Sequence, residues 1–178
     1  MDVRDAVSLL APARERLAGG GPWVDLGCGA GTFTRALAEL LPPGSAIEAV
    51  DRDAAALRRI PREHHGLSIT TRHFDVEREA LPWVDLRGVM LANVMHYTRD
   101  AAALLGRVRA VVRPGGHVVV VEYDTDDPQV PWVPHPVSRA SLARVASSAG
   151  FVAVEPLGER PSRFGGRTMY GALLSAGT

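Results

Sequence analysis

The chain has 178 residues, of which 46% are hydrophobic and 22% are charged, as in an ordinary globular domain. Its 20 basic and 20 acidic residues balance, which excludes the overall positive field that draws a protein to nucleic acid or to an anionic membrane. One cysteine excludes an intramolecular disulfide, and the sequence has neither the pattern of a secretory signal nor a run of about 18 apolar residues, so we expect a cytoplasmic protein without membrane contact.

Strands and helices alternate in the first half of the chain. Apolar residues at helical spacing over residues 3–17 predict an amphipathic helix, which forms an N-terminal segment 1–20 ahead of a core 21–178. Short apolar and β-branched runs predict strands, and prolines with glycine end the helix that follows the first of them. The expected order is a strand at 23–26, a helix at 32–41, a strand at 46–51, a helix at 53–60, and strands at 67–75 and 88–93.

The second half continues this alternation and then changes. A helix at 100–112 is capped by Asp100, and the apolar run 117–123 predicts a strand covered on both faces. A loop rich in proline and acid leads to a helix at 138–150. The last two strands, 151–156 and 168–175, have no helix between them, which is typical of an antiparallel pair.

This order of elements predicts one α/β domain spanning residues 1–178. We expect a Rossmann-like, doubly wound, mostly parallel seven-stranded sheet with one antiparallel strand and helices on both faces. About a dozen residues join the third and fourth strands, so the crossover helix there is expected to be reduced to a turn.

Three glycines follow the first strand, in the stretch "WVDLGCGAGTF" from Trp23 to Phe33. Each glycine costs roughly 0.5–1 kcal/mol relative to alanine in ordered structure, so the cluster needs a reason. In such a sheet, ligands bind beyond the carboxyl ends of the strands, and the helix after the glycines directs its free N–H groups there. The glycines therefore predict a loop that binds a cofactor.

The spacing of the glycines distinguishes between two cofactors. A dinucleotide fingerprint reads G-x-G-x-x-G, and its third glycine would fall at Thr32. The observed pattern, Asp25-x-Gly27-x-Gly29-x-Gly31, resembles the first motif of the class I S-adenosylmethionine-dependent methyltransferases. The segments "EAVDRD", "HFDVE", "LANVMHY", "RPGG" and "AGF" are similar to later motifs of that family, in the same order. The likeness extends from about residue 23 to residue 174. Within the family, the chain resembles small stand-alone bacterial members.

The resemblance implies roles for individual residues. Asp51 would accept hydrogen bonds from both ribose hydroxyls, and Asp75, with the N–H of Val76, would bind adenine. Asp25 and Asn93 suit the positive groups of the cofactor. Cys28 is interpreted as a small packed side chain, and no metal is expected. The full set of expected cofactor contacts is Asp25, Gly27, Cys28, Gly29, Gly31, Asp51, Arg52, Asp75, Val76 and Asn93.

The acceptor of the methyl group is expected in the loops above the cofactor. Methyl transfer requires in-line positioning at about 3–3.5 Å, and a base only where the acceptor must lose a proton. His96 is the first candidate for that base because its ordinary pKa is near neutrality, with a packed structural histidine as the alternative. The expected catalytic residues are His96, Glu122 and Asp124, and the expected acceptor contacts are Tyr97, Tyr123, Trp132, His135 and Arg163.

The acceptor class follows from what the chain lacks. Residues 93–96 do not form the Asn/Asp-Pro-Pro-Tyr/Phe tetrapeptide of enzymes that methylate the amino groups of nucleic-acid bases. We therefore expect a small-molecule acceptor, in a pocket that is either open or closed by a second copy of the chain. Two alternatives remain: an oxidoreductase or epimerase that uses NAD, and a non-catalytic module that binds S-adenosylmethionine. The sequence leaves the acceptor and its methylated atom unspecified.

Overall fold

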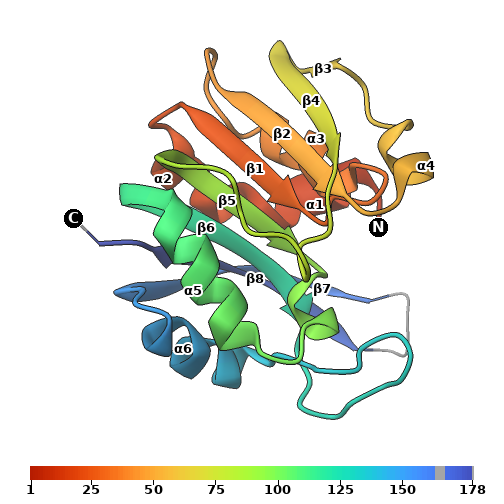
Figure 1. Cartoon of the computed structure of the whole chain (residues 1–178), viewed down its shortest axis with the longest axis vertical. Coiled ribbons are helices and arrows are strands. Elements are labelled where there is room, and N and C mark those ends of the chain that lie inside the picture. Colours follow the sequence, from red (N-terminus) through yellow and green to blue (C-terminus); the bar gives the residue numbers. More distant parts are fainter. Residues whose placement is uncertain (163–166, 178) are drawn as a thin grey trace.

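The protein consists of a single β-sheet with helices on both faces (Figure 1). The structure is a computed structural model that describes residues 1–162 and 167–177. The expected strands are present, with boundaries shifted by a few residues, because strand ends depend on the neighbouring strand as much as on local sequence. In chain order the strands are β1 (Pro22–Leu26), β2 (Ala46–Asp51), β3 (Glu63–His64), β4 (Leu67–His73), β5 (Leu86–Ala92), β6 (Val112–Tyr123), β7 (Ala153–Pro161) and β8 (Thr168–Ser175).

The strand order is β3-β4-β2-β1-β5-β6-β8-β7. The pairs among β4, β2, β1, β5 and β6 are parallel, and β8 runs antiparallel to both of its neighbours. The predicted mostly parallel, doubly wound sheet is confirmed. It has one strand more than predicted, because the two-residue β3 pairs antiparallel with β4 at the edge of the sheet.

The N-terminal helix is shorter than predicted. Residues 3–17 form α1 (Val3–Leu10), a 3-10 turn η1 (Ala11–Ala13) and α2 (Arg14–Leu17) in place of one helix. Pro12 lies within this turn, and proline supplies no N–H for a continuous α-helix. The helix predicted at 53–60 is likewise only α4 (Ala54–Leu57).

The remaining helices match the expectations more closely. α3 (Thr32–Ala38) follows the glycine loop, α5 (Ala101–Val111) is capped by the side chain of Asp100, and α6 (Arg139–Ser148) is capped by that of Ser138. Residues 74–85, between β4 and β5, contain turns and no helix, as predicted. None of the helices in the described ranges is long and apolar enough to cross a membrane.

Two hydrophobic layers hold the helices to the sheet. Along β6, Val119 and Val121 face the layer that includes α1, α2 and α3, while Val118 and Val120 face the layer that includes α5 and α6. This alternation follows from the two-residue period of a strand. Because both faces are covered, the edge at the carboxyl ends of the parallel strands is left for ligands.

β6 begins earlier than predicted. The strand was expected at 117–123, but Val112 already pairs with Leu86, and the next pair is His117 with Gly88. Residues 113–116, which lie between the predicted helix and the predicted strand, therefore form a bulge within β6.

Candidate functional site

The glycine loop connects the carboxyl end of β1 to the first turn of α3. The backbone N–H groups of Gly27 and Cys28 both donate to the carbonyl oxygen of Val50, at 2.8 and 3.0 Å. Gly27 and Gly29 have φ angles of +74° and +52°, which side chains disfavour. A Cβ atom on Gly27 would lie 2.5 Å from Cγ2 of Val94, whereas one on Gly29 would meet no atom within 4 Å. Gly27 is therefore required for packing, and Gly29 presents open backbone.

Cys28 and Gly31 complete the loop. Cys28 is buried, and this burial raises the pKa of its thiol, which keeps the sulfur protonated. Gly31 is the N-cap of α3, with a φ of +78°. Both residues thus shape the loop, and the thiol has the inert character of a packed side chain.

Asp51, at the end of β2, fastens the glycine loop to the neighbouring strand. Its Oδ2 atom accepts a hydrogen bond of 2.8 Å from the N–H of Gly29, and its Oδ1 atom accepts one of 2.8 Å from the N–H of Asp53. Each carboxylate oxygen can accept a further hydrogen bond. The carboxylate is therefore fixed in orientation and still able to bind hydroxyl groups.

Asp25 is fully buried next to the last residue of β1. Its Oδ2 atom accepts a hydrogen bond of 2.6 Å from the hydroxyl of Thr34, while its Oδ1 atom is buried without a partner among the described residues. Burial is the main cause that raises the pKa of this carboxyl from 3.8 to about 7; the Thr34 hydrogen bond opposes the rise and the charge of Asp51 adds to it. A cationic group bound next to Asp25 would favour its ionised form and offset the cost of burying that charge.

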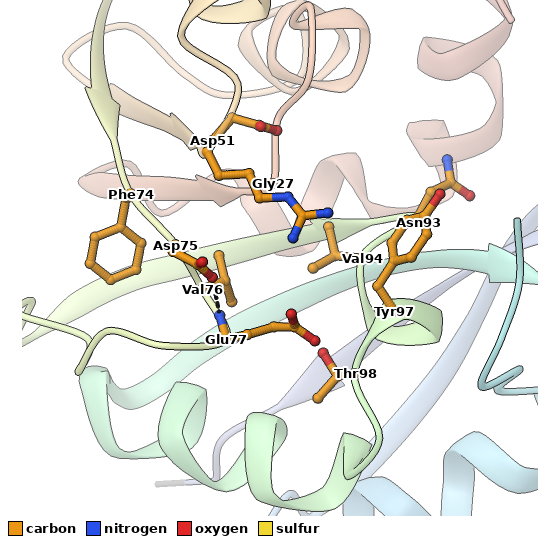
Figure 2. A pocket seen from close by; sticks show the side chains of 11 residues that line it. Gly27, Asp51, Phe74, Asp75, Val76, Glu77, Asn93, Val94, Tyr97 and Thr98 are labelled. Carbon is orange, nitrogen blue, oxygen red and sulfur yellow. Dashed lines mark hydrogen bonds between the residues drawn. The ribbon is translucent and has the colours of Figure 1, made fainter. Parts of the chain in front are cut away.

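A cavity of about 260 Å³ opens beside Asp51, while the fully buried Asp25 is not among the residues that line it. Figure 2 shows Asp51 and Asp75 on one side of it, with Asn93 and Tyr97 across from them. Seven residues expected in the functional site line it: Gly27, Asp51, Arg52, Asp75, Val76, Asn93 and Tyr97. Four others were missed: Phe74, Glu77, Val94 and Thr98. Their positions next to Asp75, Asn93 and Tyr97 in the chain were the available signal.

Asp75 begins the turn after β4. Its Oδ1 atom accepts a hydrogen bond of 3.0 Å from the N–H of Glu77, and its own N–H donates to Oε1 of Glu79 at 2.6 Å. The turn is thus held from both sides, and the Asp75 carboxylate stays at the cavity wall.

A second cavity of about 260 Å³ lies on the other side of Asn93. Asn93 lines both cavities and follows β5 with a left-handed φ of +58°, and its Oδ1 atom is buried without a partner among the described residues. The other lining residues come from the N-terminal region, α3, and the ends of β6, β7 and β8: Met1, Asp5, Phe33, Tyr123, Arg160, Pro161, Ser162 and Met169. Of these, only Tyr123 was expected to contact the acceptor.

His96 and Glu122 form a buried pair between the two tyrosines expected at the acceptor. Nδ1 of His96 lies 2.5 Å from Oε2 of Glu122, and Oε1 accepts a hydrogen bond of 2.8 Å from the N–H of Met95. The His96 ring lies 4.3 Å from that of Tyr97 and 5.8 Å from that of Tyr123, measured between centroids. Neither member of the pair lines the two cavities.

The other expected site residues are more dispersed. Asp124 forms an ion pair with Arg139, with a distance of 3.6 Å from Oδ2 to Nε. Trp132 is 74% exposed, on the loop before α6. The N–H of His135 donates to the carbonyl oxygen of His96 at 2.9 Å. Arg163 lies outside the described residues.

Metal ions have no evident site in the part of the chain that the structure describes. No group of three or more His, Cys, Asp or Glu side chains there is arranged to hold one.

A family model described as a methyltransferase domain matches residues 24–118, which is more than half of the chain. The chain belongs to the class I S-adenosylmethionine-dependent methyltransferases. The matched range of this methyltransferase begins in β1 and includes the glycine loop, Asp51, Asp75 and Asn93. The predicted family and the cofactor of that family are thus confirmed.

Curated relatives share part of their length with the chain. An uncharacterized methyltransferase of Mycobacterium tuberculosis is 32% identical over 102 residues, which cover 57% of this chain and 50% of the relative. Acetylserotonin O-methyltransferase of Mus musculus is 41% identical over 107 residues, which cover 55% of this chain and 27% of that enzyme. The methyltransferase thus spans at most half of these relatives.

Solved structures share the fold over almost the whole chain. The N-terminal domain of EvdMO1 with S-adenosylhomocysteine (SAH) bound has a TM-score of 0.74 at 22% identity, covering 98% of this chain and 82% of that one. The arsenic(III) methyltransferase CrArsM of Chlamydomonas reinhardtii has a TM-score of 0.69 at 18% identity, covering 99% and 73%. At these identities the likeness concerns the fold alone.

Proposed function

We propose that the protein transfers a methyl group from S-adenosylmethionine to a small-molecule acceptor. The observation that carries the proposal is the pair of cavities that meet at Asn93, one beside the glycine loop and the other between α1 and the ends of β7 and β8. One cavity suits a nucleoside and the other a second, small reactant. Both lie at the carboxyl edge of the sheet, where such folds bind ligands.

The residues of the first cavity fit S-adenosylmethionine. The Asp51 carboxylate is oriented to accept from ribose hydroxyls, and Asp75 with the N–H of Val76 offers an acceptor and a donor to adenine. Asn93 in the cavity wall and Asp25 behind it each have a buried Oδ1 atom with no partner among residues 1–162 and 167–177, and the ammonium of the cofactor could donate to such an oxygen. The open backbone at Gly29 leaves space for that part of the molecule.

The chemistry that the cofactor supplies is an electrophilic methyl group on a sulfonium. The protein's own contribution is to bind both reactants in line and to exclude water, which is worth several kcal/mol of the barrier. Phe74, Val94 and Tyr97 supply apolar wall beside the cofactor cavity. Asn93, which belongs to both cavities, marks the place where the reacting atoms would meet.

Proton removal, where the acceptor needs it, is proposed for His96. Because an ionised Glu122 only accepts hydrogen bonds, it would hold the proton of His96 on Nδ1 and leave Nε2 as the basic nitrogen. The burial of the His96 side chain, 2% exposed, equally supports a structural pair that fixes the turn η2 (Met95–Tyr97). Asp124 is proposed to orient the acceptor, and its pairing with Arg139 is the competing role.

The volume of the second cavity and the net charge of the chain both favour a small acceptor. The second cavity has room for about one ring, and the chain has no net charge to attract nucleic acid. Two of the similar proteins point the same way: one is named for acetylserotonin, and a structure of the EvdMO1 N-terminal domain was obtained in the presence of SAH and D-fucose. A cytoplasmic location and a second copy that closes the pocket stay predictions.

Calorimetry with SAH and with NAD tests the proposal. We expect SAH to bind and to raise the Tm, and NAD to do neither. The reverse result would identify an NAD-dependent enzyme. Incubation with S-adenosylmethionine and a panel of small acceptors should then yield SAH, and binding without any such turnover would leave a non-catalytic module.

A further inference from the structure

The described residues of the second cavity include one charged pair, Arg160 with Asp5. Nη1 of Arg160, near the end of β7, lies 3.2 Å from Oδ1 of Asp5 on α1. The two side chains are 37% and 35% exposed, so both reach the cavity surface. A guanidinium has five N–H donors, and this contact uses one of its nitrogens. Arg160 therefore keeps donors for a ligand.

The polar groups around this pair favour an anion. Tyr123 and Ser162 add two hydroxyl groups to the described wall, where they hydrogen-bond to each other. Arg160 is therefore the cationic donor on which an anion would depend. Burial is the main cause that raises the pKa of the Tyr123 phenol, and the hydrogen bond with Ser162 opposes the rise, so the phenol adds no negative charge to the wall. Among the described lining residues Asp5 is the single carboxylate, and it lies in the first turn of α1, where the helix dipole favours its charge without any ligand.

The remaining walls are apolar and suit a flat ring. Phe33 supplies an aromatic ring, and Met169 and Met1 supply flexible thioether side chains that adapt to such surfaces. With a volume of about 260 Å³, the cavity has room for one ring and its substituents.

We propose that the second cavity selects acceptors that carry a carboxylate on a small flat ring, and that Arg160 is the residue that selects them. This inference rests on the proposed function in one respect, namely that the molecule in the second cavity is the methyl acceptor. Asp5 acts as a resident counter-ion that a bound carboxylate displaces from Arg160. The selective arginine thus lies at the end of β7, three residues before Arg163, the arginine expected from the sequence.

Ligand-observed NMR with benzoate, and with benzamide as its neutral match, tests the inference on the whole protein with and without SAH. We expect benzoate to bind about ten- to 100-fold more tightly than benzamide, the ratio that a charge-assisted hydrogen bond provides. Arg160→Gln should abolish the preference. Asp5→Asn should strengthen benzoate binding several-fold, because the competing carboxylate is removed.

Arg16→Gln is the matched control, because Arg16 forms a similar ion pair with Glu155, at 3.1 Å, on residues that do not line the cavity. Its benzoate affinity should equal that of the wild type. The inference would be overturned if the wild type bound benzoate and benzamide equally well or bound neither. It would also be overturned if Arg160→Gln kept the preference for benzoate, or if Asp5→Asn bound benzoate more weakly than the wild type. Failure to bind SAH would overturn the proposed function and the acceptor role of the bound molecule, whereas the benzoate measurements without SAH would still decide whether Arg160 selects a carboxylate.

Discussion

Nδ1 of His96 lies 2.5 Å from Oε2 of Glu122, and neither residue is more than 1% exposed. The same carboxylate accepts from the N–H of Met95, so it also anchors the turn that follows β5. Glu122 and Tyr123 are consecutive in β6, and Tyr123 lines the second cavity. The pair therefore connects the turn after β5 with the strand that carries an acceptor-side residue.

His96→Ala tests whether this pair takes part in proton transfer. If His96 is the base, turnover should fall by about 10²–10⁴-fold while the affinity for SAH stays unchanged, because the cofactor cavity does not include the imidazole. Steady-state kinetics and calorimetry measure the two quantities.

His96→Gln provides the control, because its amide can still donate to Glu122 but cannot act as a base near neutral pH. It should recover the Tm lost in His96→Ala without recovering turnover. A fall in turnover of less than tenfold in His96→Ala would leave the pair with a structural role only.

Gly29→Val should abolish SAH binding while the fold survives. The added side chain would enter open space beside the loop, since no protein atom lies within 4 Å of the Cβ position. Gly44→Val is matched to it: Gly44 also has a left-handed φ, +84°, and open space at its Cβ, but it lies in the turn before β2. In both variants a valine would have to adopt a left-handed backbone conformation, which costs about 1–2 kcal/mol.

Calorimetry should therefore separate two variants whose Tm values fall by similar amounts. Normal SAH binding by Gly29→Val would show that the glycine loop does not hold the cofactor.

Asp51→Ala should weaken SAH binding by about 2–4 kcal/mol, the range for removing a charged partner of two hydroxyls. Asp53→Ala is the comparison, because the Asp53 side chain accepts from the N–H groups of Ala55 and Ala56 as the N-cap of α4. It should reduce stability by about 0.5–2 kcal/mol and leave SAH affinity nearly unchanged. Equal losses of affinity in the two variants would contradict the assignment of Asp51 to the ribose.

The lining of the first cavity was largely predictable because its signals are local. The glycine spacing and the acids that end β2 and follow β4 lie within short motifs, and the parallel sheet brings its strand ends to one edge. The second cavity was not predictable in this way. Asp5, Phe33 and Arg160 come from three distant segments, and only the packing of α1 against α3 and β7 brings them together.

The misjudged helices have a similar physical origin. The spacing of apolar residues over 3–17 fits one helix. Pro12 has no N–H to continue that helix, and it lies in the turn η1 that interrupts it. The bulge at 113–116 depends on the register between β5 and β6, which no local motif records. Local patterns therefore predicted which elements exist, and long-range packing decided where they bend or end.

Asp25 should make the ligand-free protein less stable as the pH rises from about 4 to about 7. Below its ordinary pKa of 3.8 the carboxyl is protonated in both the folded and the unfolded states, so it contributes no difference. Between 3.8 and about 7 the unfolded chain loses this proton while the folded protein keeps it, so the free energy of unfolding falls with rising pH. The total loss is about 4 kcal/mol, since each pH unit in this range is worth about 1.4 kcal/mol.

Urea unfolding of wild type and Asp25→Asn from pH 4 to pH 8 measures this effect. Relative to the wild type, the variant should gain stability across the range, because its amide has no proton to release. Thr34→Val removes the hydrogen bond that lowers the pKa of Asp25, so the decline of its stability should extend to higher pH than in the wild type. Parallel stability curves for wild type and Asp25→Asn would mean that Asp25 is ionised throughout, and that its unpartnered oxygen is already satisfied in the ligand-free protein.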